Sequence, residues 1–117
     1  GEAIPRVVDI ASLSEAVLEM SKKGMGMTAI VDRGDRLVGI FTDGDLRRAL
    51  NKLGDLRKQS VREVMTPGPR TIRPNQLAAE AVQLMDEYKI TQLLAVDTDM
   101  RLVGALNMHD LMRAKVI

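Results

Sequence analysis

The chain has 117 residues, of which 45% are apolar and 28% are charged, and its formal net charge is +1. This balance is typical of a folded globular protein, and the interleaved charges, with one Phe and one Tyr, argue against a nucleic-acid-binding surface. No apolar stretch approaches the roughly 20 residues that cross a bilayer, and the absence of cysteine excludes disulfides and thiolate metal sites.

The first strong element is a helix that begins after Ser12, preceded by a short strand near residues 7–8. Ser12 and Glu15 have the spacing of a capping box, in which the hydroxyl and the carboxylate satisfy two free amides. Gly24 and Gly26 mark the end of this helix. Apolar residues recur along it at helical spacing: Leu13, Ala16, Val17 and Met20.

Two apolar segments and a second helix follow. Residues 29–31 are suited to a strand buried on both faces, and residues 32–35 are typical of a turn. Residues 37–41 favour another strand, in which Gly39 indicates the close approach of another backbone or a ligand. After Asp45, apolar residues again recur at helical spacing: Leu46, Ala49, Leu50 and Leu53.

The second half of the chain repeats the first at an offset of 65 residues. Segments 36–39 and 101–104 both read Arg-Leu-Val-Gly, and Asp45 falls on Asp110. The sequence therefore predicts an α+β fold of two modules, residues 1–55 and 56–117, each strand-helix-strand-strand-helix. Because a half-chain of this size buries too little surface alone, we expect the modules to pack as a pseudo-two-fold pair.

No constellation typical of an enzyme is found. The chain has a single histidine, no nucleophile elbow, no Walker loop and no dinucleotide-binding glycine pattern. We expect neither catalysis nor a bound metal or required cofactor.

The junction between the third strand and the second helix is the best candidate site. Thr42 followed by Asp45 is itself an N-cap pattern, which is a purely structural interpretation. A functional interpretation adds to it: a helix N-terminus attracts an anion, Thr42 can donate to a phosphate, and Asp45 can accept from ribose hydroxyls. The second repeat offers Asn107, His109 and Asp110 at this place, and His109 is either a surface or capping residue or a ligand contact.

These motifs resemble a known family. Two units that end in Gly-x-x-Thr-x-x-Asp-Leu or its equivalent, with Val-Met-Thr-Pro at 64–67 opening the second, resemble a CBS-domain (Bateman) pair. Residues 39–48 and 108–114 resemble in particular the C-terminal CBS pair of bacterial D-arabinose 5-phosphate isomerases. The resemblance implies that catalysis belongs to a separate sugar isomerase (SIS) domain, which interconverts ribulose 5-phosphate and arabinose 5-phosphate for synthesis of the lipopolysaccharide sugar Kdo. The opening of the first unit would precede Gly1, so we expect the chain to be a fragment.

The resemblance also implies roles for individual residues. Thr42 would contact the phosphate, Asp45 the ribose, and Asp110 would match Asp45 in the second repeat. Asn107 stands where CBS motifs carry a hydroxyl and these isomerases often a histidine, and Lys115 where they tend to carry glycine, so the two sites are expected to differ. The other positions expected to line the ligand pocket are Met27, Thr28, Thr66, Thr91 and Gln92.

The expected ligand is an adenine nucleotide (AMP or ATP) or CMP-Kdo, whose carboxylate would pair with an arginine. The arginines available for this role are Arg47, Arg48, Arg70, Arg73 and Arg113. The alternative is a ligand-free scaffold that dimerises isomerase subunits. In either case we expect a homodimer of CBS pairs in a tetrameric isomerase, located in the cytoplasm, with neither nucleic acid nor membrane as a partner.

Overall fold

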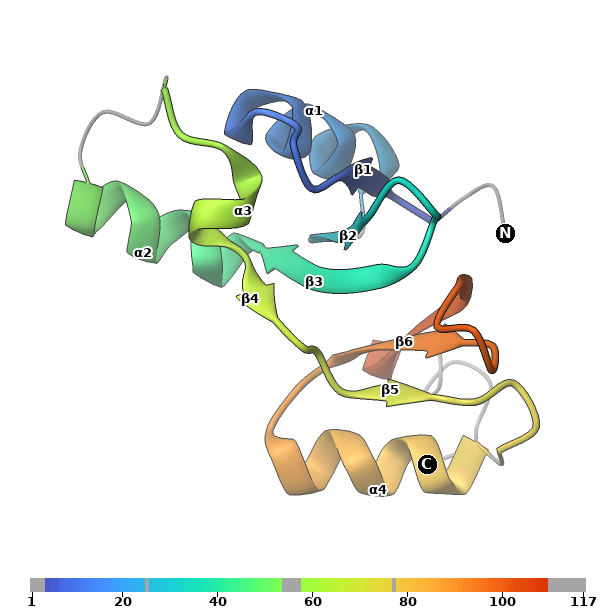
Figure 1. The fold of residues 1–117 in the computed structure, drawn as a ribbon. Coiled ribbons are helices and arrows are strands. Elements are labelled where there is room, and N and C mark those ends of the chain that lie inside the picture. The colour runs from blue at the N-terminus through green and yellow to red at the C-terminus, as the bar shows by residue number, and fades with distance from the viewer. Residues whose placement is uncertain (1–3, 25, 54–57, 77, 110–117) are drawn as a thin grey trace. The chain divides into compact units, whose positions relative to one another are not determined.

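The computed structural model describes residues 4–24, 26–53, 58–76 and 78–109. It divides into two compact units, Gly1–Pro69 and Arg70–Ile117. The first unit is a small sheet with helices beside it, and the second is a small sheet with one helix among its described elements (Figure 1), which confirms the predicted α+β class.

The first unit contains a four-stranded sheet in the order β1-β2-β3-β4. Strands β1 and β2 are parallel, whereas the pairs β2–β3 and β3–β4 are antiparallel. Its elements are β1 (Arg6–Val8), α1 (Leu13–Lys23), β2 (Met27–Val31), β3 (Leu37–Thr42), α2 (Asp43–Leu53), α3 (Val61–Val64) and β4 (Thr66–Pro67).

The second unit repeats the strand-helix-strand-strand order that opens the first unit, and its strands form a three-stranded sheet in the order β5-β6-β7. Strands β5 and β6 are parallel, and β6 and β7 are antiparallel. The helix predicted after Asp110 lies outside the described residues. The elements are β5 (Thr71–Ile72), α4 (Ala78–Tyr88), β6 (Gln92–Val96) and β7 (Leu102–Asn107).

The segment that connects the repeats packs on the first unit. Backbone hydrogen bonds run from Leu13 N to Gln59 O and from Val61 N to Ala11 O, both at 3.0 Å. Strand β4 then extends the first sheet by pairing with β3. The compact units therefore divide after Pro69, whereas the sequence repeat predicts a module boundary at 55/56. The difference arises because residues 59–67 belong to the second repeat in sequence and to the first unit in space.

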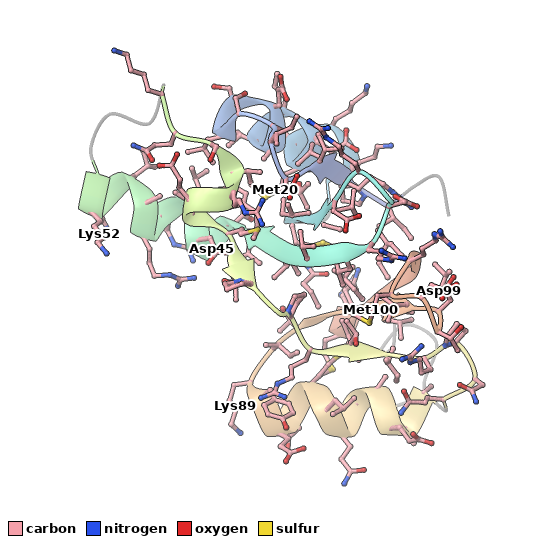
Figure 2. All side chains as sticks on the ribbon, in the orientation of Figure 1. Met20, Asp45, Lys52, Lys89, Asp99 and Met100 are labelled. Atoms are coloured by element: carbon pink, nitrogen blue, oxygen red, sulfur yellow. The ribbon has the colours of Figure 1, made fainter. Side chains whose placement is uncertain are left out.

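Helix α1 forms where the sequence predicts it. Ser12 Oγ accepts a hydrogen bond from Glu15 N at 3.1 Å, and Gly24 ends the helix in the left-handed conformation with φ of 67°. The apolar face of α1 packs on the sheet in a core that includes Ile30 and Phe41, both fully buried. Methionines fill these cores as their flexibility permits, with Met20 (Figure 2) and its repeat equivalent Met85 both buried.

The two strand glycines at equivalent positions have different surroundings. Gly39 faces its neighbour strand so closely that a Cβ atom would lie 3.1 Å from the Thr66 carbonyl oxygen and closer still to Met65 Sδ. Among the described residues, a Cβ atom on Gly104 would meet only Ala95 Cβ, at an ordinary 3.5 Å. The predicted close approach of a second backbone is thus confirmed at Gly39, where β4 pairs with β3.

Each repeat closes its hairpin with the same aspartate turn. Asp32 Oδ1 accepts from Gly34 N and Arg36 N at 2.8 and 3.0 Å. In the second unit Asp97 Oδ1 accepts in the same way from Asp99 N and Arg101 N, both at 2.9 Å. The residues before the arginines take positive φ, 65° at Asp35 and at Met100, the latter labelled in Figure 2. These turns explain why an aspartate follows each buried strand.

The turn at Asp97 should make the stability of the protein depend on pH. The backbone N–H of Arg101, and then that of Asp99, lower the pKa of the Asp97 carboxyl from its ordinary value, because they bind its charged form. The resulting stabilisation is present above the pKa of the unfolded chain and is lost as pH falls through the lower folded pKa. Asp97→Asn should therefore unfold at lower urea concentration than the unchanged protein at pH 7, with the gap closing below about pH 4.

Urea titrations at several pH values check this expectation. Thr98→Ala changes the same turn without removing a titratable group, so the difference between its urea midpoint and that of the unchanged protein should stay constant with pH. If the difference for Asp97→Asn is equally constant, the charge of Asp97 contributes nothing to stability.

Candidate functional site

The start of α2 is held by a reciprocal pair of hydrogen bonds. Thr42 Oγ1 accepts from Asp45 N at 3.1 Å, and Asp45 Oδ2 accepts from Thr42 N at 3.0 Å. This is a capping box, so the structural interpretation of the Thr42–Asp45 spacing is confirmed. The capping box does not use the full hydrogen-bonding capacity of the Thr42 side chain, because a hydroxyl that accepts one hydrogen bond still has its own proton to donate.

Asp45 is the most heavily engaged side chain of this site. Its carboxylate is only 6% exposed, and Oδ1 accepts from Arg48 Nη2 at 2.6 Å and from Thr66 Oγ1 at 3.0 Å. Figure 2 shows Asp45 at the beginning of α2, beside the strand β4 that supplies Thr66. The carboxylate therefore joins helix α2 to a segment 21 residues further along the chain.

Arg48 has a role in this site that the sequence interpretation misses. The sequence suggests it only as one of several arginines for a ligand carboxylate, whereas in the structure it pairs with Asp45. The signal was present: Asp45 and Arg48 are three residues apart on a helix, a spacing that brings opposite charges together. The Arg48 side chain is 72% exposed, and its guanidinium lies beside Gly44, within 3.4 to 3.6 Å of where a Cβ would stand.

The opening of β2 lies next to the same helix start. Met27 pairs with Thr42 across the sheet, and Asp43 N donates to Gly26 O at 3.2 Å. The structure thus brings Met27 beside the Thr42–Asp45 pair. Both Met27 and Thr28 are fully buried, and the Thr28 hydroxyl donates to Ala16 O at 3.3 Å.

In the second unit, the equivalent junction brings together part of the predicted set. Gln92 pairs with Asn107 across β6 and β7, and Met108 N donates to Thr91 O at 2.9 Å. His109 is exposed, and Asp110 lies outside the described residues. The roles assigned to these residues stay predictions.

The described ranges contain neither a metal-binding cluster nor a membrane-spanning helix. No three His, Cys, Asp or Glu side chains within residues 4–24, 26–53, 58–76 and 78–109 are arranged to hold a metal ion. Among the helices of these ranges, none combines the length and the apolar character that crossing a membrane requires.

Curated relatives match the chain over its full length. Arabinose 5-phosphate isomerase KdsD of Pseudomonas aeruginosa is 51% identical over 117 residues, which cover 36% of that protein. KdsD of Salmonella typhimurium is 48% identical over 117 residues, covering 35% of it. The chain thus spans about a third of the length of these relatives.

Solved structures and a family profile agree on the fold. A crystal structure of CBSX2 in complex with AMP is 28% identical, with a TM-score of 0.86, over 98% of this chain and 89% of that one. The cytosolic domain of the Mg²⁺ channel MgtE in complex with ATP is 26% identical, with a TM-score of 0.80, over 96% of this chain and 45% of that one. The profile of the CBS domain matches residues 4–52 and again residues 61–117. The chain belongs to the CBS-domain family and contains two copies of that domain.

Proposed function

We propose that this chain is the nucleotide-sensing regulatory module of a cytoplasmic D-arabinose 5-phosphate isomerase. Its similarity to KdsD supports the assignment to that enzyme, and CBS neighbours solved with AMP and ATP support a nucleotide ligand. In this proposal the isomerase active site lies in a SIS domain. The CBS pair controls the activity of that domain because ligand binding favours one arrangement of the enzyme over another.

The observation that carries the proposal is the buried carboxylate of Asp45 beside the hydroxyl of Thr42. This carboxylate already accepts from Thr42 N, Arg48 Nη2 and Thr66 Oγ1, and ribose hydroxyls are donors of the same kind as the Thr66 hydroxyl. The Thr42 hydroxyl proton and the first turn of an 11-residue helix favour a phosphate. The two side chains together would hold the sugar and the phosphate of one nucleotide.

The ligand is proposed to be AMP, ATP or CMP-Kdo, the activated end product of the pathway that feeds on arabinose 5-phosphate. CMP-Kdo carries a carboxylate in addition to ribose and phosphate. The exposed Arg48 guanidinium lies close enough to Gly44 and the helix start to supply its counter-charge. In the second repeat Asn107 replaces the threonine, so that site is proposed to bind more weakly.

A thermal-shift series with AMP, ATP, CMP and CMP-Kdo tests the proposal. A ligand that binds only the folded chain, at a hundred times its Kd, stabilises it by about 2.7 kcal/mol. We expect a clear rise in Tm with at least one of the four, and no rise with ribose-free pyrophosphate at the same ionic strength. Unchanged Tm values with all four ligands would contradict nucleotide sensing.

A second candidate function is a ligand-free dimerisation scaffold, which the exposed apolar side chains of the first unit favour. Leu18 on α1 is 70% exposed and Ile10 before it is 65% exposed, while Leu50 on α2 is half exposed. A shallow depression beside Leu18 is lined also by Val7, Glu15, Glu19, Ser21 and Lys22. Sedimentation measurements that show a dimer, together with no ligand response in the thermal-shift series, would support this function instead.

A further inference from the structure

We propose that the hydrogen bond from Thr66 to Asp45 is a latch on strand β4 that nucleotide binding releases. A ribose hydroxyl takes the place of the Thr66 hydroxyl on Asp45 Oδ1, and β4 then loosens from β3. This inference rests on the proposed nucleotide site and adds to it a physical route by which occupancy reaches the segment between the repeats.

The first step is the number of acceptor positions on Asp45. Each carboxylate oxygen accepts about two hydrogen bonds. Oδ1 already accepts from Arg48 and Thr66, and Oδ2 accepts from Thr42 N. One position is left, whereas the two vicinal hydroxyls of a ribose need two. A ribose held through both hydroxyls must therefore displace one of the present donors.

The second step is the choice of donor. Loss of Arg48 would leave a buried carboxylate without its counter-charge, and that bond is short and charge-assisted at 2.6 Å. The bond from Thr66 is neutral and longer, at 3.0 Å, and its replacement exchanges one hydroxyl for another. Thr66 is an exposed residue, so its released hydroxyl can bind water. Thr66 is the donor that leaves.

The third step is the weak attachment of β4. The strand has two residues, one of them a proline without an N–H, and it pairs with β3 only at Gly39 and Ile40. Just beyond it, Gly68 N donates to Val38 O at a long 3.3 Å. The Thr66–Asp45 bond therefore adds to a small number of hydrogen bonds that hold this strand.

The chain before β4 is anchored independently. Val61 is fully buried, Met65 N donates to Val61 O at 2.9 Å, and Arg62 pairs with Asp9 at 2.9 Å. None of these contacts involves Asp45. Release of Thr66 should therefore free β4 and Gly68 without detaching α3.

The test compares the unchanged chain with Thr66→Val, which removes the hydroxyl at similar volume, using AMP as the probe. Thr66→Val should bind AMP about threefold to tenfold more tightly, because the ligand no longer competes with a hydrogen bond of ordinary strength. Amide hydrogen exchange at Gly68 should accelerate when AMP saturates the unchanged chain. In Thr66→Val it should be fast with or without AMP, while the Met65 amide stays unaffected throughout.

Thr66→Ser restores the hydroxyl and should restore both properties, and Thr98→Val is the matched substitution at an exposed turn that should change neither. Equal AMP affinities for the unchanged chain and Thr66→Val, with Gly68 exchange unmoved by AMP, would overturn the latch and leave the nucleotide site intact. Failure of AMP, ATP, CMP and CMP-Kdo to bind any variant would overturn the latch together with the proposed function.

Discussion

Asp45→Ala should weaken binding of the nucleotide at least tenfold while the protein stays folded. Two ribose hydroxyls donating to a charged acceptor contribute about 1.5 to 3 kcal/mol each, and release of the Thr66 hydrogen bond offsets about 0.5 to 1.5 kcal/mol of this gain, so the net loss is at least about 1.5 kcal/mol. Each factor of ten in Kd corresponds to about 1.4 kcal/mol, which converts this loss to at least about one order of magnitude. Isothermal titration calorimetry with AMP measures the change directly.

The cost of this substitution in stability should be smaller. Asp45→Ala removes the carboxylate half of a capping box, an effect of about 1 kcal/mol. Arg48 is 72% exposed and Thr66 is an exposed residue, so both donors can turn to water once the carboxylate is gone. Urea denaturation should therefore show a modest shift that leaves the folded state fully populated during the titration.

Asp43→Ala is the matched control, because it removes an exposed carboxylate from the same first turn of α2. It should leave AMP affinity within about twofold, a change of only about 0.4 kcal/mol. A second comparison uses 2′,3′-dideoxy-AMP, which lacks both hydroxyls and should bind the unchanged chain and Asp45→Ala equally poorly. If Asp45→Ala binds AMP as tightly as the unchanged chain, the ribose is held elsewhere.

Local sequence signals predicted most of the fold. Helix α1 is capped by Ser12 and Gly24 as the sequence predicts, and β2 is buried along its whole length as its apolar run indicates. The offset of 65 residues allowed each element of the second unit to be expected from its counterpart in the first. The caps and the apolar run depend on residues within a few positions of one another, and the repeat is visible from comparing the chain with itself, which is why a single sequence reveals them.

The surroundings of Asp45 could be predicted only in part. Its hydrogen bonds with Thr42 follow from a spacing of three residues. Its pairing with Arg48 has the same spacing and could have been predicted in the same way. Its bond to Thr66 spans 21 residues and exists only because β4 folds back along β3. Thr66 was expected at the site from the family resemblance, but no local pattern indicates which atom it contacts. The roles of the predicted site residues in ligand binding stay predictions.

The repeat also suggested more equivalence than the structure has. Gly39 and Gly104 occupy the same position of identical Arg-Leu-Val-Gly segments. Strand β3 pairs with a fourth strand, β4, whereas no fourth strand pairs with β7 among the described residues. Of these two glycines, therefore, only Gly39 is constrained by the backbone of such a strand. Identical sequence therefore does not imply an identical requirement for glycine, and this difference can be measured.

Gly39→Ala should destabilise the protein by about 1 to 3 kcal/mol, the usual cost of forcing a methyl group into a filled site. The new Cβ would lie 3.1 Å from the Thr66 carbonyl oxygen and would press on the side chain of Met65. Movement of Met65 alone does not relieve the contact with the backbone, so β4 has to shift. The free energy of unfolding from urea denaturation gives the magnitude.

Gly104→Ala supplies the internal control, since the two glycines are equivalent in the repeat and neither needs positive φ. Its Cβ would make an ordinary contact of 3.5 Å with Ala95 Cβ, and alanine restricts the unfolded chain more than glycine does. Gly104→Ala should therefore be neutral or stabilising by up to about 1 kcal/mol. A double-mutant cycle separates the cause: in a Met65→Ala background, Gly39→Ala should cost less, because part of the overlap has been removed. Equal effects of the two glycine substitutions would mean that β4 does not constrain Gly39.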